Sequence, residues 1–228
     1  DAHSVTDHTQ TNWNGIVGAM TLRAESPVWI DDVQVYPDVA KRSVTVRVTV
    51  GNATGKEGTC RLELTSTAYN TDCTHAAGPL DVTSRLESDS TVICVVFPLG
   101  EGAPLWDEFH PALHRLTVKL TAACGETTYT DERRVSFGLR EFSTVGTQFA
   151  INGRLTFLRG TLECAVFPAT GYPATDTATW RRICRVVKEH GLNHIRFHSW
   201  CPPEAAFVAA DEAGVYLQVE CGTWGYVG

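Results

Sequence analysis

The chain has 228 residues, of which 43% are hydrophobic and 20% charged, and its formal net charge is −7. This length allows one large or two small domains with hydrophobic cores, and the composition is that of a globular protein. A negative charge without long runs argues against nucleic acid or an anionic membrane as a partner. No apolar run approaches the roughly 20 residues that span a bilayer, so we predict no membrane-spanning helix.

The first 24 residues contain one predicted strand, over residues 16–22, which follows the polar turn Thr11-Asn12-Trp13-Asn14-Gly15. A single strand cannot bury both of its faces. We therefore interpret this segment as the last strand of a domain.

Residues 28–139 are predicted to form a succession of short strands, separated by turns rich in Gly, Asn, Asp and Pro. The clearest strand is 43–50, in which four valines face a core and the residues between them face solvent. Cys94, inside an apolar run, is expected to be a small buried residue. Strands at this spacing are typical of an immunoglobulin-like β-sandwich. The expected strands are 28–36, 43–50, 60–67, 91–97, 113–120 and 127–135.

An α/β region is predicted after the sandwich. It begins with a hairpin, because Asn152-Gly153 separates the apolar runs 148–151 and 155–158 and both turn residues accept positive φ. The run 161–164 is expected to be the first strand of the region, and Asp176 or Thr177 is expected to cap the next helix. Gly191 should end that helix, whose buried stripe is expected at Trp180, Ile183, Val186 and Val187.

Residues 193–220 are predicted to form a strand, a loop, a helix and a second strand. Arg196 lies between apolar residues, which is the alternation of a strand with two different faces. His198 lies in the loop, Gly214 ends the helix, and the second strand ends at Glu220. Ligands bind at the C-terminal ends of strands in barrels and open α/β sheets, so these polar residues are site candidates. A structural ion pair between Arg196 and Glu220, with an idle loop histidine, is the alternative.

Several separated motifs resemble those of glycoside hydrolase family 2, which contains β-galactosidases, β-glucuronidases and β-mannosidases. The matching motifs are Asn193-x-x-Arg196 followed by His198 and Pro202, Asp211-x-x-Gly214, Glu220 at a strand end, Arg159-Gly160, Phe137-Gly138-Leu139-Arg140 and the segment beginning Pro104-Leu105-Trp106. The sequence departs from the family at two positions. His114 stands where the family has Tyr, and the His that the family carries near Cys164 is absent.

The resemblance implies a multidomain β plus α/β chain. Residues 1–24 would be the last strand of a jelly-roll sugar-binding domain. Residues 25–140 would be an immunoglobulin-like β-sandwich, and residues 141–228 the first three strands of a (β/α)8 barrel.

The resemblance also implies retaining exo-hydrolysis of a β-glycoside, with a galactoside or glucuronide preferred, by two carboxylates. In the family both carboxylates are glutamates on later barrel strands, and the acid/base follows an Asn. This sequence contains no Asn-Glu pair. We therefore expect both catalytic glutamates beyond residue 228, and no activity from this chain alone.

What remains for this chain is the wall of a sugar site. Arg196 would position a carboxylate or a sugar hydroxyl through its rigid fork, and His198 and Glu220 would bind hydroxyls. Trp200 would stack on a sugar face, with a packed core aromatic as the alternative, and Glu163 would face the pocket or solvent. Asn14, with Asn12, would reach the site, with ordinary turn residues as the alternative.

We expect no cofactor and no metal, because His194-x-x-x-His198-x-x-Cys201 offers no fourth ligand at motif spacing. A cysteine nucleophile lacks any flanking signature, and a Cys60–Cys73 disulfide is left open. The expected partner is a carbohydrate, and the open edges of an incomplete barrel predict association with another chain or a homo-oligomer. The rival hypothesis is a non-catalytic β-sandwich module that binds carbohydrate or protein.

Overall fold

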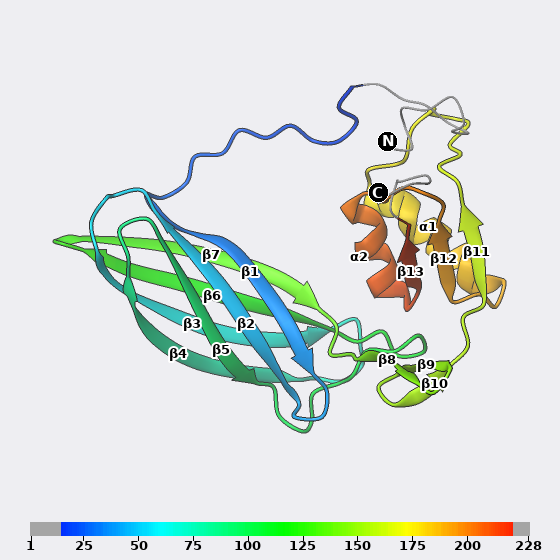
Figure 1. Cartoon of the computed structure of the whole chain (residues 1–228), viewed down its shortest axis with the longest axis horizontal. Helices are drawn as coiled ribbons and strands as arrows, with labels where there is room; N and C mark the ends of the chain where they lie inside the picture. Colours follow the sequence, from blue (N-terminus) through cyan, green and yellow to red (C-terminus); the bar gives the residue numbers. More distant parts are fainter. Residues whose placement is uncertain (1–14, 221–228) are drawn as a thin grey trace, which may run out of the picture. The chain divides into compact units, whose positions relative to one another are not determined.

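The computed structural model describes residues 15–220, and its elements are labelled in Figure 1. The chain divides into two compact units. One runs from Leu22 to Leu155, and the other comprises, within the described range, residues 156–220 together with residues 15–21. Within the described range, no helix is long and apolar enough to cross a membrane.

The first unit is a β-sandwich of two antiparallel sheets. One sheet has the order β1-β2-β5 and the other β4-β3-β6-β7, and the side chains between them form one hydrophobic core. The strands are β1 (Val28–Asp38), β2 (Ser43–Asn52), β3 (Gly58–Tyr69), β4 (Ala76–Leu86), β5 (Ser90–Pro98), β6 (Leu113–Cys124) and β7 (Thr127–Phe137). The valine alternation of β2 is confirmed, since all four expected valines are fully buried.

All six expected strands are present, but the prediction missed β4. This strand contains Gly78, Pro79 and Asp81, residue types that are depleted in strands. It lies at the edge of its sheet, where a proline is tolerated because no outer neighbour needs its N–H. The prediction for Cys94 was wrong. Its side chain is exposed, because Ile93 and Phe97 take the inward positions of β5 and Cys94 alternates outward.

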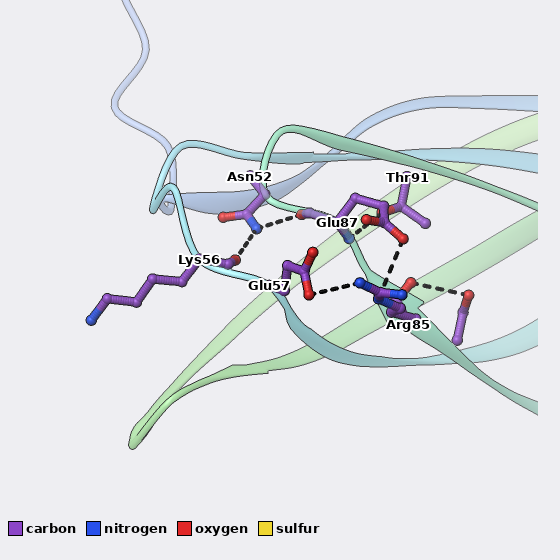
Figure 2. A network of polar contacts seen from close by, with 7 residues as sticks. Asn52, Lys56, Glu57, Arg85, Glu87 and Thr91 are labelled. Atoms are coloured by element: carbon purple, nitrogen blue, oxygen red, sulfur yellow. Dashed lines mark hydrogen bonds and ion pairs between the residues drawn. The ribbon is translucent and has the colours of Figure 1, made fainter.

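Asn52 joins two turns at one end of the sandwich (Figure 2). Its side chain is almost fully buried, and its amide nitrogen donates to the carbonyl oxygens of Lys56, at 2.8 Å, and Glu87, at 2.7 Å. Arg85 adds exposed ion pairs with Glu57, at 2.7 Å, and Glu87, at 3.5 Å. The β2–β3 and β4–β5 turns are therefore held together by one buried amide and a surface charge cluster.

The expected hairpin is confirmed. Strands β8 (Phe142–Val145), β9 (Gln148–Ile151) and β10 (Arg154–Thr156) form a small sheet. Asn152 and Gly153 both have positive φ, 50° and 77°. The Asn152 side chain accepts from the N–H of Glu141, at 2.9 Å, and donates to the carbonyl of Trp106, at 3.0 Å. These bonds attach the hairpin to the sandwich, and both lie in the compact unit that runs from Leu22 to Leu155.

The second unit contains a parallel sheet in the order β11-β12-β13, with β11 (Gly160–Glu163), β12 (His194–Phe197) and β13 (Tyr216–Val219). Helices α1 (Thr177–Glu189) and α2 (Glu204–Ala213) connect the strands. Asp176 caps α1, as predicted, by accepting from the N–H of Thr179 at 2.8 Å. The buried stripe of α1 is Trp180, Cys184 and Val187, whereas Val186 is 39% exposed because it lies off this i, i+4, i+7 line.

The strand predicted over residues 16–22 does not form. Residues 15–27 contain no regular element apart from bends. Ile16, Met20 and Leu22 are 71%, 80% and 101% exposed. A strand needs a neighbour to satisfy its backbone and cover a face, and this segment pairs with no strand in the described chain.

Candidate functional site

The middle strand of the parallel sheet, β12, separates two faces of different character. Ile195 and Phe197 are 2% and 0% exposed and pack with the apolar side chains of the two helices. Arg196 lies between them and therefore projects to the opposite face. Leu162 and Gln218 are in register with Arg196 on the neighbouring strands, so the face away from the helices carries the guanidinium.

Arg196 forms an ion pair with Glu220, as the sequence predicts for these two strand ends. The other carboxylate oxygen of Glu220 accepts from the backbone N–H of Ser199 at 2.9 Å. The Arg196 side chain is 48% exposed and that of Glu220 21%. Desolvation alone would raise the pKa of Glu220, but the Ser199 N–H, Arg196 and His198 outweigh it and lower the pKa. Glu220 is therefore held ionised beside a fixed cation.

Cys164 and His198 lie on the same face, one position beyond the strands. The sulfur is 3.9 Å from Nδ1 of His198, and the His198 N–H donates to the Glu163 carbonyl at 2.8 Å, which continues the β11–β12 ladder. Burial, followed by the charge of Glu163, raises the pKa of the Cys164 thiol. In the sequence, Cys164 stands out only as the place of an absent histidine. Side chains alternate between the two faces along a strand, so Cys164, the residue after Glu163, projects to the face opposite that of Glu163. This alternation is the sequence signal that would have placed Cys164 on the Arg196 face.

Two backbone positions at this edge are strained. Ala165 and Ser199 have φ of 56° and 60°, the left-handed region that non-glycine residues rarely adopt. Each is held by a carboxylate, because Glu163 accepts from the Ala165 N–H at 3.0 Å and Glu220 from that of Ser199. Strained backbone of this kind concentrates at functional sites, and here it follows two adjacent parallel strands.

Glu163 reaches the same edge from the other face. It is in register with Phe197, not with Arg196, so its side chain projects toward the helix side of the sheet. Burial raises the pKa of Glu163, and the Ala165 N–H and the Trp200 indole oppose that rise. The indole Nε1 is buried and makes no hydrogen bond of standard geometry. The structure thus separates Glu163 from the Arg196 face.

Trp200 is a core residue. It is 7% exposed and belongs to the cluster that α1 and α2 cover. Its ring meets those of Phe197 and Phe167 edge-on, with centroids 5.4 and 6.3 Å apart. Of the two uses that the sequence leaves open, the packed aromatic is the one observed.

The remaining expectations concern Asn12 and Asn14, a metal site and a disulfide. Asn14 and Asn12 lie outside the described residues. No group of three or more His, Cys, Asp or Glu side chains within 15–220 has metal-site geometry, and all seven cysteines described there are free thiols, including Cys60 and Cys73.

The family model described as "Glycosyl hydrolases family 2" matches residues 28–140. The chain belongs to glycoside hydrolase family 2. The match covers strands β1 to β7, which form the sandwich, and ends at Arg140.

Two curated relatives are β-galactosidases. Beta-galactosidase 2 of Enterobacter cloacae is 24% identical over 222 residues, which are 95% of this chain and 21% of that protein. The beta-galactosidase of Lactococcus lactis subsp. lactis is 26% identical over 116 residues, 51% of this chain and 11% of that protein. The chain therefore spans about a fifth or less of the relatives that it matches.

Solved family 2 structures share the fold. A glycosyl hydrolase family 2 member from Bacteroides cellulosilyticus has a TM-score of 0.68 and 20% identity, over 84% of this chain and 24% of that one. Beta-glucuronidase 2 of Bacteroides uniformis, covalently bound to cyclophellitol-6-carboxylate aziridine, has a TM-score of 0.66 and 22% identity, over 86% of this chain and 24% of that one. Identity at this level supports the common fold and not a common substrate.

Proposed function

We propose that this chain is part of a retaining exo-glycoside hydrolase and that the C-terminal edge of β11, β12 and β13 forms one wall of its β-glycoside site. The observation that carries the proposal is the Arg196–Glu220 ion pair at that edge, next to the strained Ser199. A fixed cation and anion side by side can donate to and accept from the hydroxyls of one sugar. The half-exposed guanidinium remains accessible to a ligand.

The parallel sheet would be the start of a (β/α)8 barrel. Its three strands are adjacent in chain order and linked by helices, as in a barrel. The apolar face is covered by α1 and α2, and the polar face would become the barrel interior. We further propose the division of the chain into residues 1–24 from a jelly-roll domain, 25–140 as the immunoglobulin-like sandwich and 141–228 as part of the barrel.

Each side chain at the edge would have a defined task. Arg196 would position a catalytic carboxylate or a sugar hydroxyl, and Glu220 would accept from hydroxyls while holding the guanidinium. His198 would bind a hydroxyl from the same face. Glu163 would support the edge by holding the loop at Ala165 from the helix-covered face of the sheet.

Catalysis itself would require groups that this chain does not supply. Retaining enzymes use two carboxylates about 5 Å apart, and the 228 residues contain no Asn-Glu pair of the kind that carries the acid/base in the family. A galactoside or a glucuronide is the proposed substrate, supported by the names of the relatives, β-galactosidases and β-glucuronidases.

The test compares this chain with the longest product of its gene on nitrophenyl β-galactoside, β-glucuronide and β-mannoside. The longer protein should hydrolyse one of the first two, and NMR should show the β-anomer as the first sugar product. The 228-residue chain should show no turnover above buffer. Activity that survives repurification of the short chain would refute its assigned role, and a longer protein inert on every substrate would favour the binding-module hypothesis.

A further inference from the structure

Three buried polar atoms without hydrogen-bond partners lie at one corner of the sandwich. They are Oγ of Ser66 and the Nδ1 atoms of His75 and His114. Ser66 is 1% exposed and His114 is fully buried. An unsatisfied buried polar atom is destabilising and uncommon in a native fold, so three in one corner require an explanation.

Strand register brings these three residues together. On the β3–β6 ladder Ser66 is opposite Leu116 and Ala68 is opposite His114, so Ser66 and His114 are diagonal neighbours on the same inward face. The carbonyl of His75 accepts from the N–H of Ala68 at 2.9 Å. The two imidazole rings are perpendicular, with centroids 5.7 Å apart.

The hydrogen bonds of the two rings fix their protonation. Nε2 of His75 is 3.0 Å from the Leu99 carbonyl, and Nε2 of His114 is 2.9 Å from the Pro104 carbonyl. A carbonyl oxygen only accepts, so each Nε2 carries a proton. When the rings are neutral, each Nδ1 is therefore a buried acceptor that lacks a donor.

One water molecule has the donors and acceptors to satisfy all three atoms. It has two O–H donors for the two Nδ1 atoms and a lone pair that accepts from the Ser66 hydroxyl. Internal waters occur where about three polar groups would otherwise be unpaired. A direct bond between the two rings would instead require one ring to give up its Nε2 proton and its carbonyl partner.

We propose that Ser66, His75 and His114 form a buried binding site for one structural water, and that protonation of His114 in mild acid releases the loop of residues 99–112. The two imidazoles bond to carbonyls near the start of this loop. A proton on Nδ1 of His114 turns the ring into a cation. The ring keeps its Nε2–H bond to Pro104 and can donate to the water, but the closed corner then holds a fully buried charge with no anionic partner. Proton uptake therefore favours a loop that opens and lets the ring reach water.

The surroundings oppose that charge. The His114 ring stacks on Phe137, with centroids 5.2 Å apart. Burial lowers the pKa of His114; the Pro104 carbonyl raises it, and His75 lowers it further. Two arginines on the packed elements are cations and do not offset this. Arg42 is a cation that donates to Ala103 in the same loop at 2.9 Å, and Arg115, on the outer face of β6, lies over the Tyr69 ring.

Releasing the loop has a consequence at the end of the sandwich. The N–H of Trp106 in this loop donates to the Leu139 carbonyl at 3.1 Å, and the Trp106 carbonyl accepts from Asn152 of the β9–β10 turn at 3.0 Å. Opening of the loop breaks the histidine bonds to the Leu99 and Pro104 carbonyls and therefore loosens the segment that attaches the hairpin to the sandwich.

The experiment measures NMR signals and amide exchange from pH 7.5 to 5 on the whole chain. At pH 7.5 both imidazoles should be Nε2–H tautomers, and the His114 ring protons should show cross-peaks to a long-lived water. As the pH falls, the protection factor of the Trp106 N–H should drop by up to about tenfold per pH unit per proton taken up. Protection in the β2 and β3 core should fall less.

Two variants and one probe complete the test. Ser66→Ala keeps both histidines and should weaken the water cross-peaks, and His114→Gln should abolish the pH-dependent loss of protection at Trp106. The control is His110→Gln, an exposed histidine in the same loop, which should leave that loss unchanged. An Nδ1–H tautomer in either ring, equal pH dependence in His114→Gln, or shifts of both rings with micromolar Zn²⁺ would overturn the proposal.

Discussion

Arg196 and Glu220 meet across neighbouring parallel strands although they are not in register. Arg196 is level with Gln218 on β13, and Glu220 reaches back from one residue beyond that strand while its second oxygen holds the Ser199 N–H. One carboxylate thus fixes both the guanidinium and the strained turn after β12. The geometry couples the position of Arg196 to the conformation of the loop that carries His198.

The first prediction tests whether the Arg196–Glu220 pair serves the glycoside site or only stabilises the fold. Because Arg196 is half exposed, Arg196→Ala and Glu220→Gln should change the unfolding midpoint of this chain only slightly. In a longer, active protein each should lower kcat/KM on the order of 100-fold, since a fixed donor or its anchor is lost. Steady-state kinetics with a nitrophenyl glycoside measures this.

The control for that prediction is the exposed Arg181–Glu212 pair between α1 and α2, whose two hydrogen bonds are 2.6 and 2.9 Å long. Arg181→Ala removes an ion pair of similar exposure away from the proposed site. It should leave kcat/KM unchanged. Full activity of Arg196→Ala would return the Arg196–Glu220 pair to a purely structural role.

The second prediction concerns the opposite pKa shifts of two carboxyls at one sheet edge. Burial raises the pKa of Glu163 above 4.5, so its stabilising effect is present below the unfolded value and is lost as pH rises through the folded value. The pKa of Glu220 is lowered, so its effect is present above 4.5 and is lost as pH falls. The free-energy difference between wild type and Glu163→Gln should therefore decrease with rising pH.

The corresponding difference for Glu220→Gln should increase over the same range. Urea unfolding of the three proteins between pH 3.5 and 7 gives both slopes. Slopes of the same sign would contradict the environments described for the two carboxyls.

Much of the fold followed from local pattern. The alternating valines of β2 and the Asn152-Gly153 turn carry their structure in adjacent residues, and both were predicted. The predictions that were wrong concerned segments whose structure depends on residues far away in the sequence. β4 forms because β3 offers it a partner, residues 16–22 have no partner strand, and Cys94 is exposed because its neighbours take the core.

The site was predictable in outline for a similar reason. Parallel strands place their C-terminal ends together, so Arg196 and Glu220 had to share an edge. Which face each side chain takes depends on register across strands. The register of β11 and β12 places Glu163 on the face opposite Arg196 and Cys164 on the same face as Arg196. Packing around Phe197 and Phe167 places Trp200 in the core.

The third prediction follows from that placement of Trp200. Trp200→Ala should destabilise the second unit by about 3–5 kcal/mol, because it leaves a large cavity beside Phe197. Trp200→Phe should cost much less, since a ring still fills the space. Urea unfolding measures both, and an Ala variant of wild-type stability with weakened glycoside binding would instead support a stacking platform.

The fourth prediction concerns Gly160, which faces His194 across β11 and β12. A Cβ at Gly160 would lie 2.3 Å from Nδ1 and 3.2 Å from Cγ of His194, and His194 is buried. Gly160→Ala should therefore destabilise the sheet by about 1–3 kcal/mol through overpacking. His194→Ala in the same chain should relieve that loss, and Gly18→Ala, which meets no atom within 4 Å, is the control.

The last prediction compares two members of the polar network in Figure 2. The Asn52 side chain makes two buried donations and also accepts from the N–H of Thr54 at 3.0 Å. Asn52→Ala removes the buried amide that pairs with these groups, and an unpaired group that stays buried costs about 1–3 kcal/mol. We expect a total loss of about 3 kcal/mol in the free energy of unfolding of the sandwich, since the relaxed turns will recover part of their bonds with water.

Arg85→Ala tests the alternative that the charges hold this end together. Its ion pairs with Glu57 and Glu87 are more than half exposed, so solvent screening leaves them little net effect, and the variant should unfold at the wild-type urea midpoint. A loss in Arg85→Ala equal to that in Asn52→Ala would show that the surface charges, and not the buried amide, join the two turns. The amide is expected to dominate because the Asn52 side chain is buried, at 3% exposure, whereas water readily replaces each ion-pair partner of Arg85.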